Sequence, residues 1–99
     1  MSDARTQALQ LVREGHDLHY GAADDPDRAL LDGDRLYAAG LEKLAESGDL
    51  EAIAVLADLI SACARAAAEE TPAEADAAWA RAAARLGVTG FTSPQPSER

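Results

Sequence analysis

One carboxylate, Asp34, lies where the sequence predicts the apolar face of a helix. Positions 30, 34, 37 and 41 fall along one line of an α-helix, and apart from Asp34 this line holds Leu30, Tyr37 and Leu41. A carboxylate buried without a partner costs several kcal/mol, so a hydrogen-bond donor is required if this line is covered. Tyr37 and the histidines nearer the N-terminus are the candidate donors. Two interpretations stay open: Asp34 is a hydrogen-bonded or rim residue of the core, or it forms part of a ligand pocket.

Two histidines, His16 and His19, stand three residues apart on another predicted helix. Such a pair can hold one metal ion from a single helix face, and helical bundles use this spacing for carboxylate–histidine sites. The chain has neither Glu-x-x-His nor His-x-x-x-His, and the pair also fits a helix C-terminus, whose negative dipole favours protonated imidazole. The ligand or metal candidates are therefore His16, His19, Asp34 and Tyr37. We predict no resident cofactor and assign no metal ion.

No residue stands out as a nucleophile. The single cysteine, Cys63, lies on a predicted apolar stripe, where a thiol behaves as a small hydrophobic group. The sequence contains no Gly-rich phosphate loop and no nucleotide-binding fingerprint. We therefore expect no catalytic residues and a protein that is not an enzyme.

Turn signals place these residues on four helices. We predict helices over about residues 3–18 and 26–47, a third beginning after Asp49, and a fourth from Pro72 to Gly87. Asp25-Pro26 is typical of a helix start. This role explains the acids at 24, 25 and 27 better than Mg²⁺ binding does. Thr71 and Glu74 have the spacing of a capping box. The short connection at Gly48 predicts an antiparallel hairpin of the second and third helices.

The predicted inward faces define an all-α fold. We expect a small four-helix antiparallel bundle over residues 1–87, followed by a disordered tail over 88–99 in which only Phe91 could dock locally. The inward residues are expected to be Leu30, Asp34, Tyr37, Leu41 and Leu44 on the second helix; Ile53, Leu56, Ala57, Ile60, Cys63, Ala64 and Ala67 on the third; and Ala75, Ala78, Trp79, Ala82 and Leu86 on the fourth.

Three residues are candidates for an interface. Gly33 and Gly40 stand one heptad apart, where a neighbouring backbone could approach closely. Trp79 is the largest side chain, and it either fills the core or anchors a partner.

Composition limits the partners. The formal net charge is −9, from 18 acidic and 9 basic side chains, which disfavours nucleic acid and anionic membranes. Hydrophobic residues make up 47% of the chain but aromatic residues only 4%, so the core is small and alanine-rich, and we expect a protein partner or a homo-oligomer to complete it. One cysteine, no apolar run of membrane-spanning length and no secretion signal at the N-terminus predict a cytoplasmic protein.

About half of the chain, from His19 to about Arg65, resembles the all-α polyprenyl (isoprenyl) diphosphate synthase family. The matching pieces are Tyr20-Gly21, Ala29-Leu30-Leu31, Gly33-Asp34-Arg35-Leu36 and the helix from Leu41 to Gly48-Asp49. The region that corresponds to the family's first Asp-rich Mg²⁺ motif, residues 7–11, contains no acid, and the second such motif belongs to a later helix beyond the resemblance. The resemblance therefore implies the helical hairpin and the Gly33-Asp34 pair, without the Mg²⁺-dependent diphosphate chemistry.

Three hypotheses about function follow. The first is a non-catalytic, acidic helical module for assembly or protein interaction. The second is a small-ligand or metal-binding bundle related to the isoprenoid synthases. The third is an isoprenoid-type enzyme subunit that takes its missing aspartate motif from a partner.

Overall fold

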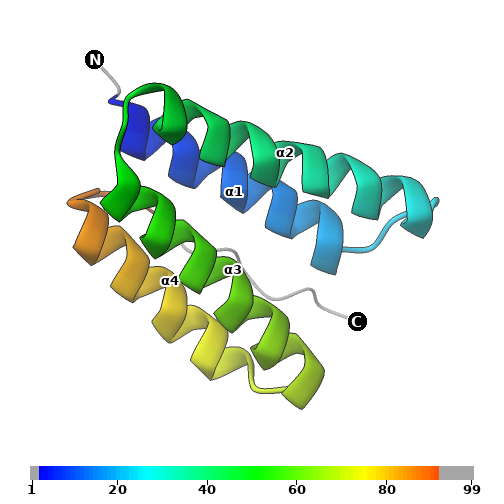
Figure 1. Ribbon diagram of the computed structural model, residues 1–99. Helices are drawn as coiled ribbons and strands as arrows, with labels where there is room; N and C mark the ends of the chain where they lie inside the picture. The colour runs from blue at the N-terminus through cyan, green and yellow to red at the C-terminus, as the bar shows by residue number, and fades with distance from the viewer. Residues whose placement is uncertain (1–2, 92–99) are drawn as a thin grey trace.

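The computed structural model describes residues 3–91 and contains four α-helices. The described residues form no β-strand, so the predicted all-α bundle is confirmed. No helix in this part of the chain has the length and apolar character needed to cross a membrane. The helices are α1 (Ala4–Tyr20), α2 (Pro26–Glu46), α3 (Leu50–Glu69) and α4 (Pro72–Leu86) (Figure 1).

Aspartates begin three of the helices. Asp3, Asp25 and Asp49 each accept a hydrogen bond from the backbone N–H three residues later, at 2.8, 3.2 and 3.1 Å. Each bond satisfies one of the N–H groups that a helix start leaves unpaired. The capping box predicted at Thr71 is wrong, because its side chain makes no cap hydrogen bond. The Thr71 hydroxyl instead lies 3.5 Å from the carbonyl oxygen of Ala66, at the end of α3.

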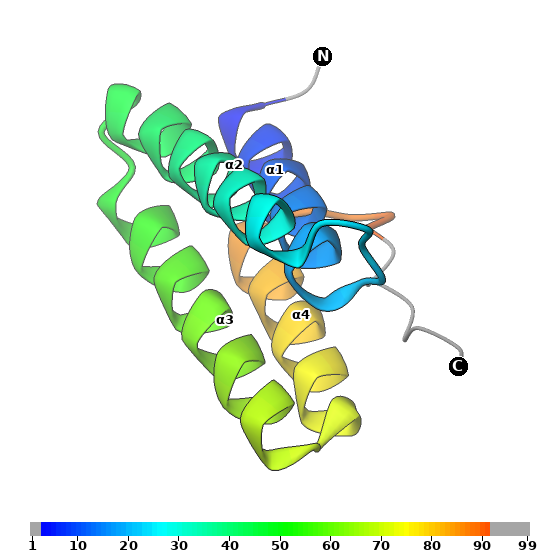
Figure 2. The ribbon, with the colours of Figure 1, turned by 90° about the vertical axis from the view of Figure 1, so that its right-hand side faces the viewer.

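The helices pack as two hairpins, α1 with α2 and α3 with α4. Figures 1 and 2 show each pair side by side, whereas the two hairpins diverge from the end that holds the α2–α3 turn. The sequence predicts a hairpin of α2 and α3. These helices do run in opposite directions, but they separate beyond the turn and each packs mainly on its other neighbour.

Three glycines allow the backbones of α1 and α2 to approach each other closely. A Cβ atom on Gly15 would lie 2.8 Å from the carbonyl oxygen of Gly33 and 2.7 Å from the Tyr37 ring. A Cβ atom on Gly40 would lie 3.0 Å from the carbonyl oxygen of Ala8. The predicted close approach at Gly33 and Gly40 is therefore present, but the neighbour is α1 of the same chain and both glycines are buried. This corrects the expectation that they serve an interface with another chain.

The close contact with α1 also determines which face of α2 is buried. That face consists of Ala29, Gly33, Gly40 and Leu44. Most of these residues precede a residue of the predicted inward line by one position. Leu30, on the predicted line, is 47% exposed. The shift follows from the glycines, because only their positions can touch the backbone of α1.

The buried face of α3 is shifted in the same way, whereas that of α4 is as predicted. On α3 the predicted Ala57, Ala64 and Ala67 are exposed. On α4 the predicted Ala78, Trp79, Ala82 and Leu86 are all buried. The buried residues of α3 are Ala52, Val55, Leu56, Leu59, Cys63 and Ala66.

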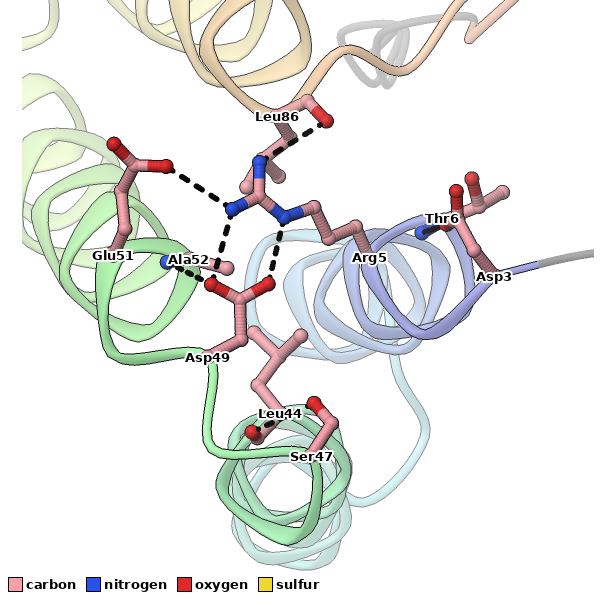
Figure 3. A network of polar contacts seen from close by, with 9 residues as sticks. All are labelled: Asp3, Arg5, Thr6, Leu44, Ser47, Asp49, Glu51, Ala52 and Leu86. Carbon is pink, nitrogen blue, oxygen red and sulfur yellow. Dashed lines mark hydrogen bonds and ion pairs between the residues drawn. The ribbon is translucent and has the colours of Figure 1, made fainter.

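Arg5 links α1 to α3 and α4 at the end of the molecule that holds the α2–α3 turn, which we call the closed end (Figure 3). Its guanidinium donates two parallel hydrogen bonds to Asp49, at 2.7 and 3.0 Å, and a third to Glu51 at 3.1 Å. A further N–H lies 3.5 Å from the carbonyl oxygen of Leu86, at the end of α4. Arg5 chiefly, together with the backbone N–H that Asp49 caps, lowers the pKa of this carboxyl. One side chain of α1 thus fixes the ends of α3 and α4.

The structure extends the folded domain beyond the predicted boundary at residue 87. Val88 and Phe91 pack against the core, and the Phe91 ring stacks on Trp79 with centroids 5.6 Å apart. Residues 88–91 therefore belong to the domain, and the rest of the predicted tail, 92–99, lies outside the described residues.

The glycine contacts can be tested by adding one methyl group. Gly15→Ala should lower the free energy of unfolding by about 1–3 kcal/mol, because the new Cβ would press on a backbone oxygen that cannot rotate away. This loss is expected even though alanine favours helix by about 1 kcal/mol. Gly40→Ala should cost less, since the nearest atoms would lie at 3.0 and 3.2 Å. Urea unfolding measures both variants.

The control for this series is Ser61→Ala, at an exposed site on α3. It should change the free energy of unfolding by less than about 0.5 kcal/mol. A Gly15→Ala variant more stable than the wild type would contradict the close packing of α1 and α2.

The ion pair at the closed end predicts coupled losses of stability. Arg5→Gln and Asp49→Asn should each destabilise the fold, and the double variant should lose less than the sum because both changes remove one interaction. Asparagine keeps the helix-capping oxygen. Because its pKa is lowered, Asp49 contributes stability that is complete above the ordinary value of 3.8 and is lost as pH falls through the lowered one. Urea unfolding across this range measures the effect, and strictly additive losses would exclude the coupling.

Candidate functional site

All the aromatic and histidine rings of this chain form one continuous series of contacts. The sequence has two Tyr, two His, one Trp and one Phe. The C-terminal part of α1 supplies the middle of the series, and α2, α4 and the segment after α4 supply its ends. The sequence therefore concentrates its few rings at one place. Ring centroids lie 4.8 Å apart for Tyr37 and His19, 5.8 Å for His19 and Tyr20, 4.6 Å for Tyr20 and His16, 5.4 Å for His16 and Trp79, and 5.6 Å for Trp79 and Phe91.

Asp34 pairs with His19 at the rim of this series. An Asp34 carboxylate oxygen lies 3.0 Å from His19 Nε2, and the same nitrogen lies 3.2 Å from the carbonyl oxygen of Leu30. Of the candidate donors, which were Tyr37 and the two histidines, His19 is the observed partner. The side chain of Asp34 is 67% exposed, so the rim interpretation fits and a covered apolar face does not. The predicted inward line of α2 is buried at Leu44 and exposed at Leu30, because the hairpins diverge in that direction.

His16 occupies a different environment from His19. Its ring packs on Tyr20 and meets Trp79 edge to face, and its Nδ1 atom is buried without a hydrogen-bond partner. Burial lowers the pKa of His16, and Asp17 opposes this shift. His16 is therefore mainly neutral at pH 7. Both histidine rings contact Tyr20, but His16 otherwise meets Trp79, whereas His19 meets Tyr37 and pairs with Asp34. Within residues 3–91, no group of three or more His, Cys, Asp or Glu side chains could hold a metal ion.

The Cys63 thiol and the Tyr37 hydroxyl are both neutral near pH 7. Burial raises the pKa of the Cys63 thiol to about 11. Burial likewise raises the pKa of Tyr37. Neither group can act as a nucleophile or a general base at neutral pH. Trp79 is 1% exposed, so its alternative role as an exposed interface anchor is wrong and its place in the core is confirmed.

An open groove lies between the hairpins where they diverge. It has a volume of about 190 Å³, and most of its walls are small apolar side chains. They come from the C-terminal parts of α1 and α3 and the start of α4, so the groove belongs to both hairpins. Its lining residues are His16, Tyr20, Cys63, Ala66, Ala67, Glu70, Pro72 and Ala75.

The side of the molecule that holds the groove also carries most of the exposed apolar side chains. We call residues 13–36 and 60–79, the parts of both hairpins away from Arg5, the open half. Among residues 3–91, the large apolar side chains with substantial exposure are Leu18, Tyr20, Leu30 and Leu31 in the open half and Leu50 outside it. Leu30 and Leu31 are 47% and 49% exposed. This concentration is the main surface feature of the structure.

Sequence reasoning missed the groove and its exposed leucines. It placed Leu30 in the core because the helical period alone cannot show that two hairpins diverge. The paired leucines at 30 and 31 carried a usable signal, since adjacent helix residues point in different directions and cannot both be buried against one neighbour.

Comparisons with protein-family models, curated proteins and solved structures find no significant match for this chain. The resemblance to the polyprenyl diphosphate synthases therefore stays a prediction.

The partly buried His16 predicts a pH dependence of stability. Between about pH 7.5 and pH 5, the unfolded chain protonates a histidine more readily than the folded chain protonates His16, so the free energy of unfolding should fall as pH falls. His16→Phe keeps a ring against Tyr20 and Trp79 but cannot titrate. Urea unfolding at several pH values should show a weaker dependence in His16→Phe, and an unchanged dependence would contradict the lowered pKa.

Proposed function

We propose that this chain is a non-catalytic, acidic helical module that binds another protein through its open half. The exposed apolar surface around the groove carries this proposal. Burying a fully exposed Leu side chain contributes about 1.5–3 kcal/mol to stability. Leu30 and Leu31 are each about half exposed, so a partner that covers both would gain about the free energy of burying one whole leucine.

The closed end shows that this exposure is not a general looseness of the fold. Leu9, Leu44 and Leu56 are completely buried there, although the chain is rich in alanine. Four of the five large apolar side chains with substantial exposure lie in the open half, and Leu50 at the start of α3 is the exception. Exposed apolar side chains concentrated in one region of a small domain are typical of an interaction site.

The chemistry of the buried groups supports a binding role and not a catalytic one. The thiol of Cys63 and the hydroxyl of Tyr37 both stay protonated at neutral pH. A role in the cytoplasm is part of the proposal, since a lone cysteine can form no intramolecular disulfide.

The alternative of a small-ligand site has less support. Ligand sites typically enclose about 300–1,000 Å³ and carry several convergent polar groups. The groove here is about 190 Å³ and offers mainly Glu70 and the ring of His16. It is better suited to side chains of a larger partner.

A matched pair of variants tests the proposal. Leu30→Gln combined with Leu31→Gln removes the two most exposed large apolar side chains of the open half, and Leu50→Gln removes one that is 76% exposed outside it. All three changes keep residues that favour helix. We expect unchanged helix content in both variants. The free energy of unfolding should stay nearly unchanged in Leu50→Gln and fall modestly in the double variant, because Leu30 and Leu31 are half-covered.

Association should separate the two variants. Light scattering after size exclusion measures self-association, and quantitative affinity capture from the native cells measures other partners. Wild type and Leu50→Gln should retain the same bound protein, and the double variant should lose at least about nine-tenths of it, as expected for a contact of about 1.4 kcal/mol or more. The proposal would be refuted if the chain is strictly monomeric and captures no protein whose binding depends on Leu30 and Leu31.

A further inference from the structure

Resting on the proposed function, we propose that the partner segment is a cationic amphipathic helix. Its apolar side chains would enter the groove between the hairpins, and its Lys or Arg side chains would face the acids around it. The inference depends on two independent features of the open half, its apolar surface and its charge.

The negative charge of the chain is concentrated in the open half. Residues 13–36 and 60–79 hold eleven of the 18 acidic side chains but only four of the nine basic ones, a formal net charge of −7 out of −9. The rest of the chain is nearly neutral. The half of the molecule that contains the apolar groove therefore carries most of the negative charge. Such a charge attracts a basic partner and raises its rate of association.

Basic residues within the open half leave this charge largely uncompensated. Arg28 and Arg35 both pair with Asp32, at 3.2 and 3.1 Å. Glu70, which lines the groove, makes no ion pair within residues 3–91. Asp34 is mostly exposed beside His19. Glu70 is thus placed to receive a cation from a partner that covers the groove, and Asp34 offers a second exposed carboxylate in the same half of the molecule.

A helix fits this surface better than an extended segment. An extended segment needs a sheet edge to satisfy its backbone N–H and C=O groups, and the described residues offer none. A helix satisfies its own backbone and presents apolar side chains along one stripe. At the closed end the same space between the hairpins is filled by side chains from helices, including Leu9, Leu44 and Leu56.

A second copy of this chain is a poorer occupant. Two open halves that faced each other would bring together two surfaces of formal charge −7. Like charges at an interface oppose association and must be desolvated without compensation. The charge therefore favours a different, basic partner.

Designed peptides test the inference directly. The probe is a peptide of about 18 residues, roughly five turns, with leucines on one helical stripe and lysines elsewhere. One control replaces every lysine with glutamate, and another scrambles the leucine positions. Fluorescence anisotropy of labelled peptide, titrated with the full chain, measures binding. The lysine peptide should bind at least about tenfold more tightly than either control, and salt should weaken it.

Variants of the chain locate the binding surface. Glu70→Gln and Asp34→Asn should each weaken the lysine peptide, whereas Glu42→Gln, at an exposed site outside the open half, should leave it unchanged. The double change at Leu30 and Leu31 should also weaken binding, and Leu50→Gln should not.

Several outcomes would overturn the inference. Equal binding of the lysine and glutamate peptides would show that charge plays no part in recognition. Equal binding of the lysine peptide and its scrambled form would show that charge alone attracts the peptide and that the leucine stripe plays no part. Self-association that depends on Leu30 and Leu31 would identify a second copy as the occupant. A captured partner that depends on these leucines but binds through a neutral or acidic segment would refute this inference and leave the interaction module standing. Loss of all leucine dependence would refute the module itself.

Discussion

The contact between the backbones of α1 and α2 determines most of the structure. At Gly15, Gly33 and Gly40 the two helices approach so closely that an added Cβ atom would meet a backbone carbonyl oxygen of the other helix. The rings of Tyr37 and His19 lie against Gly15 and Gly33. This contact turns the glycine face of α2 toward α1. The neighbouring line of α2 residues, which includes Leu30 and Asp34, is therefore not covered by α1. Helix packing at such short distance is rigid because the backbone atoms that meet there cannot rotate away. The exposure of the leucines is therefore a consequence of how the first hairpin is built.

Side-chain size explains why the hairpins separate at one end only. The closed end has large residues on both hairpins, among them Leu44 and Leu56, and it has the Arg5 ion pair. The other end of α3 and the start of α4 present cysteine and alanine, which cannot fill a widening space. The rings of α1 cover part of that space, and the groove is what remains. Small residues and negative charge thus occur together in the same half of the molecule.

The sequence predicted the helices well and their contacts less well. Caps such as Asp25 and Asp49 act within one turn, so local spacing reveals them. The faces of α2 and α3 were placed one residue late, because alanine and leucine stand on several sides of each helix and the period alone does not choose among them. The pairing of Arg5 with Asp49 joins residues 44 positions apart, and nothing in local spacing indicates it. For the candidate site, the sequence left Tyr37 and both histidines open as partners of Asp34. It did not reveal the exposure of Asp34, which depends on the divergence of the hairpins.

The series of rings has a consequence for observing this protein. The chain contains one tryptophan, and its indole stacks on Phe91 and meets His16, which lines the groove. Light absorbed by that indole is emitted from a single, known position between the core and the open half. The intrinsic fluorescence of the unmodified chain therefore reports on the junction where the two hairpins part, with no label attached.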